Sequence, residues 1–234
     1  MRAPIIPETG PKRKLLDAAE QLFAEKGFEA VSVRDITKLA NANVAAVNYH
    51  FGSREGLLTM VVTRYLAPIN EERMALMDEA ERKAGGKPIP VEEIIVAMSR
   101  PLINQVTRAE MSEQLFCKLL ARVISEQSDN LSYAVETHLR SAAHRFYDAL
   151  EKALPDLTRE EIAWRLHFTH GAMVKLLYHQ EMFKRVADIP DSTLEESFQR
   201  FVRFAVAGMC QSSLDKDAAP RKSGKASPQA SFDF

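Results

Sequence analysis

Residues 40–58 read ANANVAAVNYHFGSREGLL. Asn43 is a favourable N-cap, and the small and apolar residues after it predict a short helix to about residue 50. The preceding stretch SVRDITKLA, residues 32–40, has capping-box spacing at Ser32 and Asp35, which predicts another short helix over about 33–40. Asn41 lies between them, where asparagine tolerates a left-handed turn. The sequence therefore predicts a helix-turn-helix, whose second helix enters the major groove of DNA.

Apolar residues recur at three- and four-residue spacing along most of the chain, and alternating strand patterns are nearly absent. We therefore expect an all-α protein: a three-helix N-terminal helix-turn-helix head followed by a larger helical ligand-binding and dimerisation domain. The expected domains are 1–55 for DNA binding, 56–212 for effector binding and dimerisation, and 213–234 as a disordered tail. The expected helices begin near Pro11, 33, Asn43 and Ser53, and then span about 91–106, 110–127, 130–154, 159–185 and 193–212.

The composition narrows the class of protein. The chain has 234 residues, a formal net charge of −1, and only Cys117 and Cys210 as cysteines, which fits reduced thiols. No stretch approaches the roughly 18 apolar residues of a membrane span, and the start lacks the apolar run of a secretory signal. We expect a soluble, cytoplasmic protein without a membrane partner. Basic and acidic residues nearly balance in 1–55, so overall charge does not indicate a nucleic-acid partner.

The helix over 44–50 has two different faces. Val47 and Phe51 can turn inward together with Ile36 and Leu39. On the other face, small side chains allow close approach to the groove floor, and Asn48 can pair with the N6 and N7 atoms of adenine. The same pattern also fits a packing helix in a small bundle. As a DNA-binding helix it assigns base contacts to Val44, Ala45, Ala46 and Asn48, phosphate contacts to Tyr49, His50 and Arg54, and flanking positions to Ser32, Arg34 and Asn43.

The segments VNYHFGSREGLL and FAEKGFEAVSVRDITKLA together resemble the N-terminal domain of the TetR family of transcriptional regulators. This resemblance covers about the first quarter of the chain and implies a DNA-binding head, a helical effector-binding body and a homodimer. It also assigns the base-facing and backbone-contacting places to the residues named above. The chain departs from the family pattern by Asn41 in place of a turn glycine and by Arg54 in place of lysine. A palindromic operator with A·T pairs under Asn48 is the expected DNA partner.

The last two helices carry apolar residues on more than one side, as a helix does when it packs against two neighbours. We interpret them as half of an intermolecular four-helix bundle, and an intramolecular core remains the alternative. The expected dimerisation residues are Leu166, Ala172, Met173, Phe198, Phe201, Val202 and Ala205.

Helices between the head and that bundle carry a Met and Phe stripe, which is either plain core or the lining of a ligand pocket. The family resemblance implies an apolar effector pocket here. WRLHF at 164–168, with AVAGM at 205–209, resembles repressors that respond to long-chain fatty acids, so a fatty acid or acyl-CoA is one expected effector. Its carboxylate would need a donor such as Arg122, Arg165 or His167. The expected lining is Met98, Leu102, Phe116, Leu119, Leu120, Val123, Phe146, Trp164 and Phe168.

Enzyme signatures are weak. His167 and His170 are three residues apart, but no cysteine or carboxylate accompanies them at metal-site spacing. No phosphate-binding glycine loop or nucleophile elbow is present. We therefore expect no catalytic residue, no metal and no cofactor. The competing hypothesis is an architectural or protein-interaction helical module that does not recognise a specific operator.

Overall fold

The computed structural model describes residues 9–108, 110–125, 129–177, 186, 188 and 190–212, and the ordered elements in these ranges are helices. The expected tail at 213–234 and the end of the helix expected over 159–185 lie outside the described residues. The helices are α1 Pro11–Lys26, α2 Val33–Leu39, α3 Val44–Phe51, α4 Arg54–Ala84, α5 Val91–Arg108, α6 Glu113–Ser125, α7 Asp129–Ala153, α8 Arg159–Leu177 and α10 Leu194–Cys210. The all-α class is confirmed.

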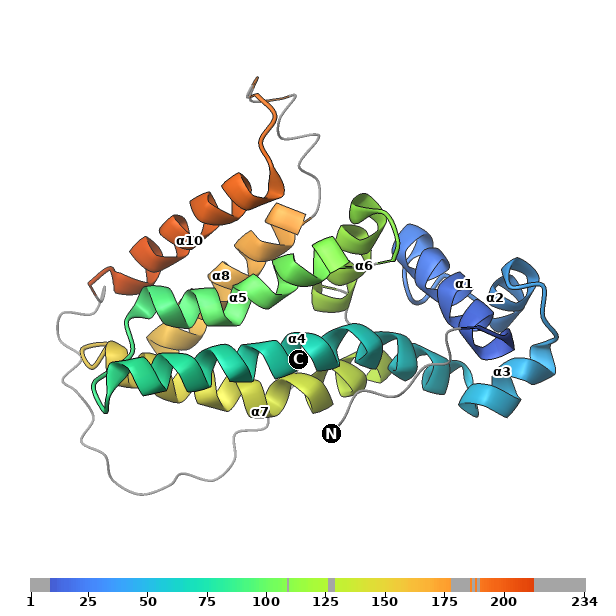
Figure 1. The fold of residues 1–234 in the computed structure, drawn as a ribbon, viewed down its shortest axis with the longest axis horizontal. Coiled ribbons are helices and arrows are strands. Elements are labelled where there is room, and N and C mark those ends of the chain that lie inside the picture. The colour runs from blue at the N-terminus through green and yellow to red at the C-terminus, as the bar shows by residue number, and fades with distance from the viewer. Residues whose placement is uncertain are drawn as a thin grey trace.

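The first three helices form a small head at one end of the molecule (Figure 1). The long helix α4 leaves the head and runs the length of the body, where it packs against α5 and α7. Helix α10 lies on α5 and α8, and α6 packs against α1 of the head. The boundary expected between residues 55 and 56 falls in the first turn of α4, so this one helix belongs to both parts.

Local capping explains where helices α2 and α3 of the head begin. The Ser32 hydroxyl accepts a hydrogen bond from the Asp35 amide at 3.2 Å, and the Asp35 carboxylate accepts one from the Ser32 amide at 3.0 Å. The Asn43 side chain caps α3 by accepting from the Ala45 amide at 3.0 Å. Asn41 adopts the left-handed conformation with φ of 49°. Each of these features was indicated by the residue type alone.

The core of the head is aromatic and aliphatic. Phe23, Phe28, Ile36 and Val47 are fully buried, and the rings of Phe23 and Phe28 lie 5.1 Å apart. Leu39 does not join this core as expected, because 48% of its surface is exposed at the end of α2. Across the described residues, no helix is long and apolar enough to cross a membrane.

Candidate nucleic-acid interface and effector-binding body

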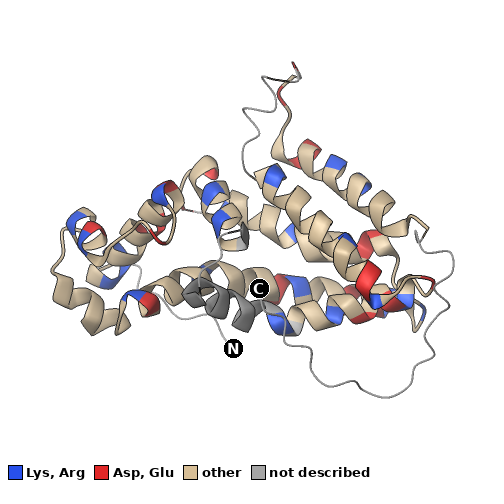
Figure 2. Cartoon of the chain, turned by 180° about the vertical axis from the view of Figure 1, so that it is seen from behind, with Lys and Arg blue, Asp and Glu red and all other residues tan. Residues whose placement is uncertain are grey.

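Helix α3 presents an uncharged outer face beyond the core. Val47 is fully buried and holds the helix on the head, while Tyr49 is 86% exposed and Val44 is 45% exposed. Ala45 and Asn48 are exposed as well. The helix contains no lysine, arginine or carboxylate, so it appears tan in Figure 2 between charged neighbours. Base edges could therefore meet methyl and amide groups here, and phosphate contacts must come from elsewhere.

Two of the flanking residues expected to contact DNA form hydrogen bonds within the head. Ser32 and Asn43 use their side chains to cap α2 and α3, and Asp35 places a carboxylate at the start of α2. Hydrogen bonds from the Ser32 side chain and backbone hold the pKa of Asp35 below its usual value. A phosphate at the start of α2 would therefore meet a negative charge, which weakens the case for that helix end as an anion site. Arg34, one residue into α2, is exposed.

The other residues expected to bind DNA differ in how far they are exposed. Ala46 and His50 are only partly exposed, and the His50 ring packs edge-on against Tyr49 at 4.9 Å. Arg54 points into the head: its Nε donates to the Val31 carbonyl at 2.9 Å, and its Nη2 donates to the Phe28 carbonyl. Through these hydrogen bonds, Arg54 joins the start of α4 to the segment between α1 and α2. The expected phosphate contact by Arg54 would compete with these bonds.

The residues expected to form the dimer face are mostly inside the single chain. Phe198 is fully buried, and 2–5% of the surface is exposed for Leu166, Met173, Phe201, Val202 and Ala205. Ala172 is partly buried. A side chain that its own chain covers has little surface left for a partner, so this burial favours the alternative, in which these residues join α8 and α10 to the body. The intramolecular core was the alternative interpretation of the same stripe.

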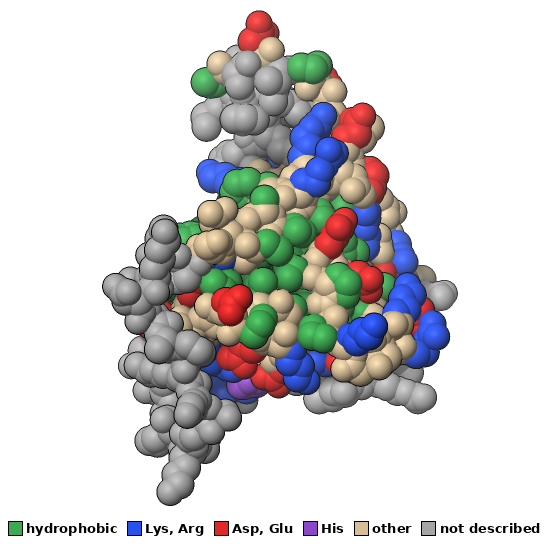
Figure 3. All heavy atoms as spheres, turned by 90° about the vertical axis from the view of Figure 1, so that its left-hand side faces the viewer, with side chains coloured by type: hydrophobic (Ala, Val, Ile, Leu, Met, Phe, Trp, Pro, Cys, Tyr) green, Lys and Arg blue, Asp and Glu red, His purple; other side chains and the backbone are tan. Residues whose placement is uncertain are grey.

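Two residues expected to line the effector pocket lie at the surface of the chain. Trp164 is 54% exposed and Phe168 is 63% exposed, with ring centroids 6.0 Å apart on the outer side of α8. Phe204 on α10 is 66% exposed. Exposed aromatic side chains that neighbour one another are typical of a surface that another molecule covers. Apolar side chains also gather between charged ones at the end of the body away from the head (Figure 3).

The other expected pocket residues lie in the interior of the body. They come from α5, α6 and α7, and each is at most 7% exposed: Met98, Leu102, Phe116, Leu119, Leu120, Val123 and Phe146. The Phe116 ring packs edge-on against Tyr65 of α4 at 4.8 Å. Burial of this set is compatible with both interpretations, a plain core and a pocket lining.

The donors expected to meet an effector carboxylate have other partners. Arg122 of α6 donates to the Ala24 carbonyl at 3.1 Å, at the end of α1. Arg165 donates to Glu161 at 2.8 Å and to the Met209 carbonyl at 2.7 Å, so it closes the C-terminal end of α10. His167 is exposed beside Trp164. These three side chains therefore tie elements together or face outward.

A charged cluster joins the head to the body. The Glu20 carboxylate of α1 is buried and accepts hydrogen bonds from Arg64 at 2.7 Å and from the Tyr65 hydroxyl at 2.6 Å, both on α4. Burial raises the pKa of Glu20 although Arg64 opposes the shift. Glu110, between α5 and α6, pairs with Arg13 and Arg64. No local sequence pattern indicates this cluster, because its members are distant in the chain.

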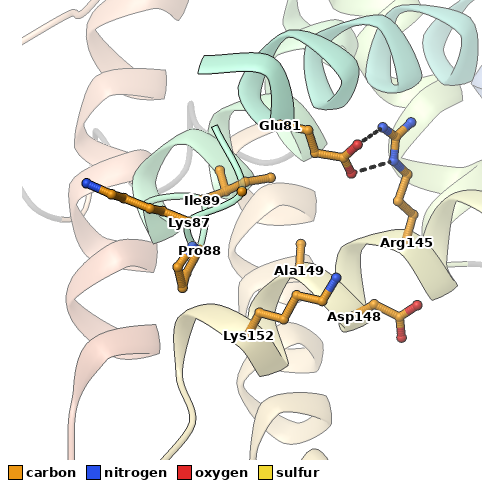
Figure 4. Close-up of a pocket in the computed structure, with 9 residues that line it drawn as sticks. Glu81, Lys87, Pro88, Ile89, Arg145, Asp148, Ala149 and Lys152 are labelled. Atoms are coloured by element: carbon orange, nitrogen blue, oxygen red, sulfur yellow. Dashed lines mark hydrogen bonds and ion pairs between the residues drawn. The ribbon is translucent and has the colours of Figure 1, made fainter. Parts of the chain in front are cut away.

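A cavity of about 490 Å³ lies at the far end of the body, between the α4–α5 turn and α7. Arg145 and Glu81 form a double hydrogen bond on one side of it, and Lys152 and Asp148 extend along α7 below (Figure 4). None of the expected effector residues lines this cavity. Within the described part of the chain, no group of three histidine, cysteine or carboxylate side chains is placed to hold a metal ion.

Comparison with known proteins gives matches to both parts. A family model described as bacterial regulatory proteins, tetR family, matches residues 15–61, and one described as tetracyclin repressor-like, C-terminal domain, matches residues 96–208. The HTH-type transcriptional regulator BetI of Brucella suis is 26% identical over 181 residues, covering 77% of this chain and 83% of BetI. The probable HTH-type regulator YttP of Bacillus subtilis is 41% identical over 54 residues, 23% of this chain and 26% of YttP.

Solved structures show the same fold. The ketosteroid transcriptional regulator KstR2 of Mycobacterium tuberculosis superposes with a TM-score of 0.59 at 18% identity, covering 88% of this chain and 98% of KstR2. A SmeT–triclosan complex superposes with a TM-score of 0.56 at 19% identity, covering 94% of this chain and 100% of SmeT. These matches do not identify the fatty-acid subgroup.

Proposed function

Because the chain belongs to the TetR family of bacterial transcriptional regulators, with a DNA-binding helix-turn-helix and a ligand-binding C-terminal domain, we propose that it is a homodimeric repressor. Two copies of the DNA-binding domain, residues 1–55, bind the half-sites of a palindromic operator. A small apolar effector in the domain of residues 56–212 then releases the DNA. The protein acts in the cytoplasm, where its operator is.

The observation that carries this proposal is the outer face of α3. Val44, Ala45 and Asn48 project from a helix whose inner residue Val47 is fully buried, so the helix approaches DNA as a rigid, uncharged ridge. Asn48 supplies the donor and acceptor that match adenine, and the methyl groups suit thymine. Tyr49 and Arg34, both exposed, are the best placed of the expected residues for phosphates.

The dimer face we propose is the exposed aromatic surface of α8 and α10, formed by Trp164, Phe168 and Phe204. Large aromatic side chains contribute most of the binding energy in many interfaces, and they are costly to leave in water. A second copy of this chain is the proposed partner because the family acts as dimers. A two-fold axis beside α8 and α10 gives two copies of α3, which must lie about 34 Å apart to meet successive major grooves.

Release of DNA requires that the effector bind a conformation in which the heads no longer fit. The proposed connection runs through α6 and α4, because Arg122 of α6 bonds to the end of α1 and Arg64 of α4 pairs with Glu20 of α1. A displacement of either helix would therefore turn the head. A coupling free energy of about 1–3 kcal/mol changes operator affinity several-fold or more.

Selection of bound sequences from a random duplex library tests the proposal directly. We expect an inverted repeat with half-site centres about one helical turn apart, and a preference of at least ~10³-fold over random duplex at physiological salt. A non-specific architectural protein would bind all duplexes with similar affinity, and its affinity would fall steeply with salt. Equal binding of all sequences would contradict the proposal that the protein is an operator-specific repressor.

A further inference from the structure

Among the residues that the structure describes, Arg73 in the middle of α4 is a buried cation without a buried anion beside it. Only 8% of its surface is exposed. Its Nε donates to the Met98 carbonyl at 2.7 Å and its Nη1 donates to the Asn70 side chain at 3.1 Å, so both partners are neutral. Among the described residues, no carboxylate pairs with Arg73.

The other buried charge in the described part of the chain provides a contrast. Glu20 has an arginine at 2.7 Å, and a tyrosine hydroxyl completes its hydrogen bonds. Removing a charge from water is unfavourable unless a counter-charge compensates it. Burial lowers the pKa of Arg73 to about 10, so the guanidinium still carries its charge at neutral pH. Glu20 thus has an oppositely charged partner, and Arg73 has none within the described ranges of the chain.

Arg73 contacts helix α5, which carries buried apolar residues. Its partner Met98 belongs to the apolar set of α5, and Leu102 lies one turn further along that helix. His170 of α8 has exposed surface, yet burial by neighbouring atoms and the charge of Arg73 lower its pKa to about 4. The charge of Arg73 contributes to this shift, so the guanidinium of Arg73 and the imidazole of His170 lie near each other.

We propose that Arg73 anchors the acidic group of the effector, which is a small organic monocarboxylate with an apolar body. This inference deepens the proposed function, because it names the effector class of the same domain. The Nη1–Nη2 edge of the guanidinium can donate two parallel hydrogen bonds to a carboxylate. His170 is neutral at pH 7 and can donate a further bond, while the buried residues around Met98 receive the hydrocarbon part.

The test compares straight-chain and aromatic monocarboxylates of increasing size with the primary amide of each. Thermal shift and calorimetry on the full chain should show at least one carboxylate that binds more tightly than its amide. Arg73→Gln should weaken that carboxylate roughly ten- to a hundred-fold while leaving its amide unchanged. Arg73→Lys, which keeps the charge, should retain part of the preference.

Arg145→Gln is the matched control, because Arg145 is also a body arginine but pairs with Asp78 and Glu81 at the surface. It should leave both affinities unchanged. The proposal is overturned if no carboxylate binds better than its amide, or if Arg73→Gln keeps the full preference. If a variant does not fold, the comparison of carboxylate and amide on the natural chain still decides. If the library selection yielded no specific operator, the proposed repressor function would be rejected, whereas the measured preference for carboxylates would still stand.

Discussion

The head and the body differ in how directly their sequences report side-chain roles. In the head, the starts of α2 and α3 coincide with capping residues, and the inward and outward sides of α3 follow from one periodic pattern. In the body, α8 carries apolar residues on two sides, and the side expected to face a partner is the one its own chain buries. Capping acts between neighbours in sequence, whereas the partner of a two-sided helix depends on contacts between distant segments.

The largest effect is expected from alanine substitutions on the two sides of α8, at the exposed Trp164 and at the buried Leu166. Trp164→Ala should weaken the dimer by about 10³-fold, because each copy loses about 2 kcal/mol at a central aromatic and the interface contains two copies. Adding Leu166→Ala to the Trp164→Ala variant should then lower the free energy of unfolding of the monomer by about 2–5 kcal/mol. Sedimentation equilibrium measures the first effect, and denaturant unfolding measures the second.

The outcome that would restore the original interpretation of α8 is specific. If Leu166→Ala alone weakened the dimer more than Trp164→Ala, without a matching loss of stability, the inner stripe would be the interface. Phe168→Ala provides a second exposed position on the same side of α8 and should act like Trp164→Ala.

Most of the fold was predictable because helix signals are local. Ser32, Asn43 and Asn41 indicate the starts and the turn of the helix-turn-helix, and the structure has all three in those roles. The roles of the arginines were not predictable. Arg54 bonds to Val31, 23 residues earlier, and Arg122 reaches Ala24, 98 residues earlier. Arg73 stands in a stretch, NEERM, that has the composition of a surface helix, so nothing local indicated its burial.

The second effect concerns base readout by α3 in the head. Asn48→Ala should remove about 1–3 kcal/mol of discrimination at one base pair of each half-site, because the bidentate amide contact is lost. Tyr49→Phe is the control: it removes a hydroxyl suited to phosphate and should weaken all operators equally. Affinities for operators changed at single positions measure both. If the Asn48→Ala variant kept every relative affinity, direct readout at this residue would be excluded.

The third effect lies at the junction of the two regions. Arg122→Gln removes charged hydrogen bonds to the end of α1, so the last turn of α1 should open more often, by about 1 kcal/mol or roughly fivefold in amide hydrogen exchange. Arg100→Gln is the control, because Arg100 pairs with Glu195 within the body. Unchanged exchange in α1 would mean that Arg122 does not hold the head, and the route through α6 would lose its support.

The smallest difference is expected between two caps, one in each region. Thr193 caps α10 of the body with the same reciprocal bonds that Ser32 forms in the head. Ser32→Ala and Thr193→Ala should each cost about 1 kcal/mol of stability, since a cap acts only on its own helix.

The cap bonds also lower the pKa of Asp35, through the Ser32 side chain first, and of Glu196, through the Thr193 backbone first. A carboxyl group whose pKa is lower in the folded state stabilises the fold at pH values above its pKa in the unfolded chain, near 3.8 for Asp35 and 4.5 for Glu196. This stabilisation is lost as the pH falls through the pKa of the folded state. Ser32→Ala removes the larger cause at Asp35, so this variant should approach the natural chain in stability under acid conditions, whereas Thr193→Ala keeps the backbone bond to Glu196 and should do so less; denaturant titrations over a pH series would measure both. A cap in the body that cost several times more than the cap in the head would show that even this local signal depends on the surrounding contacts.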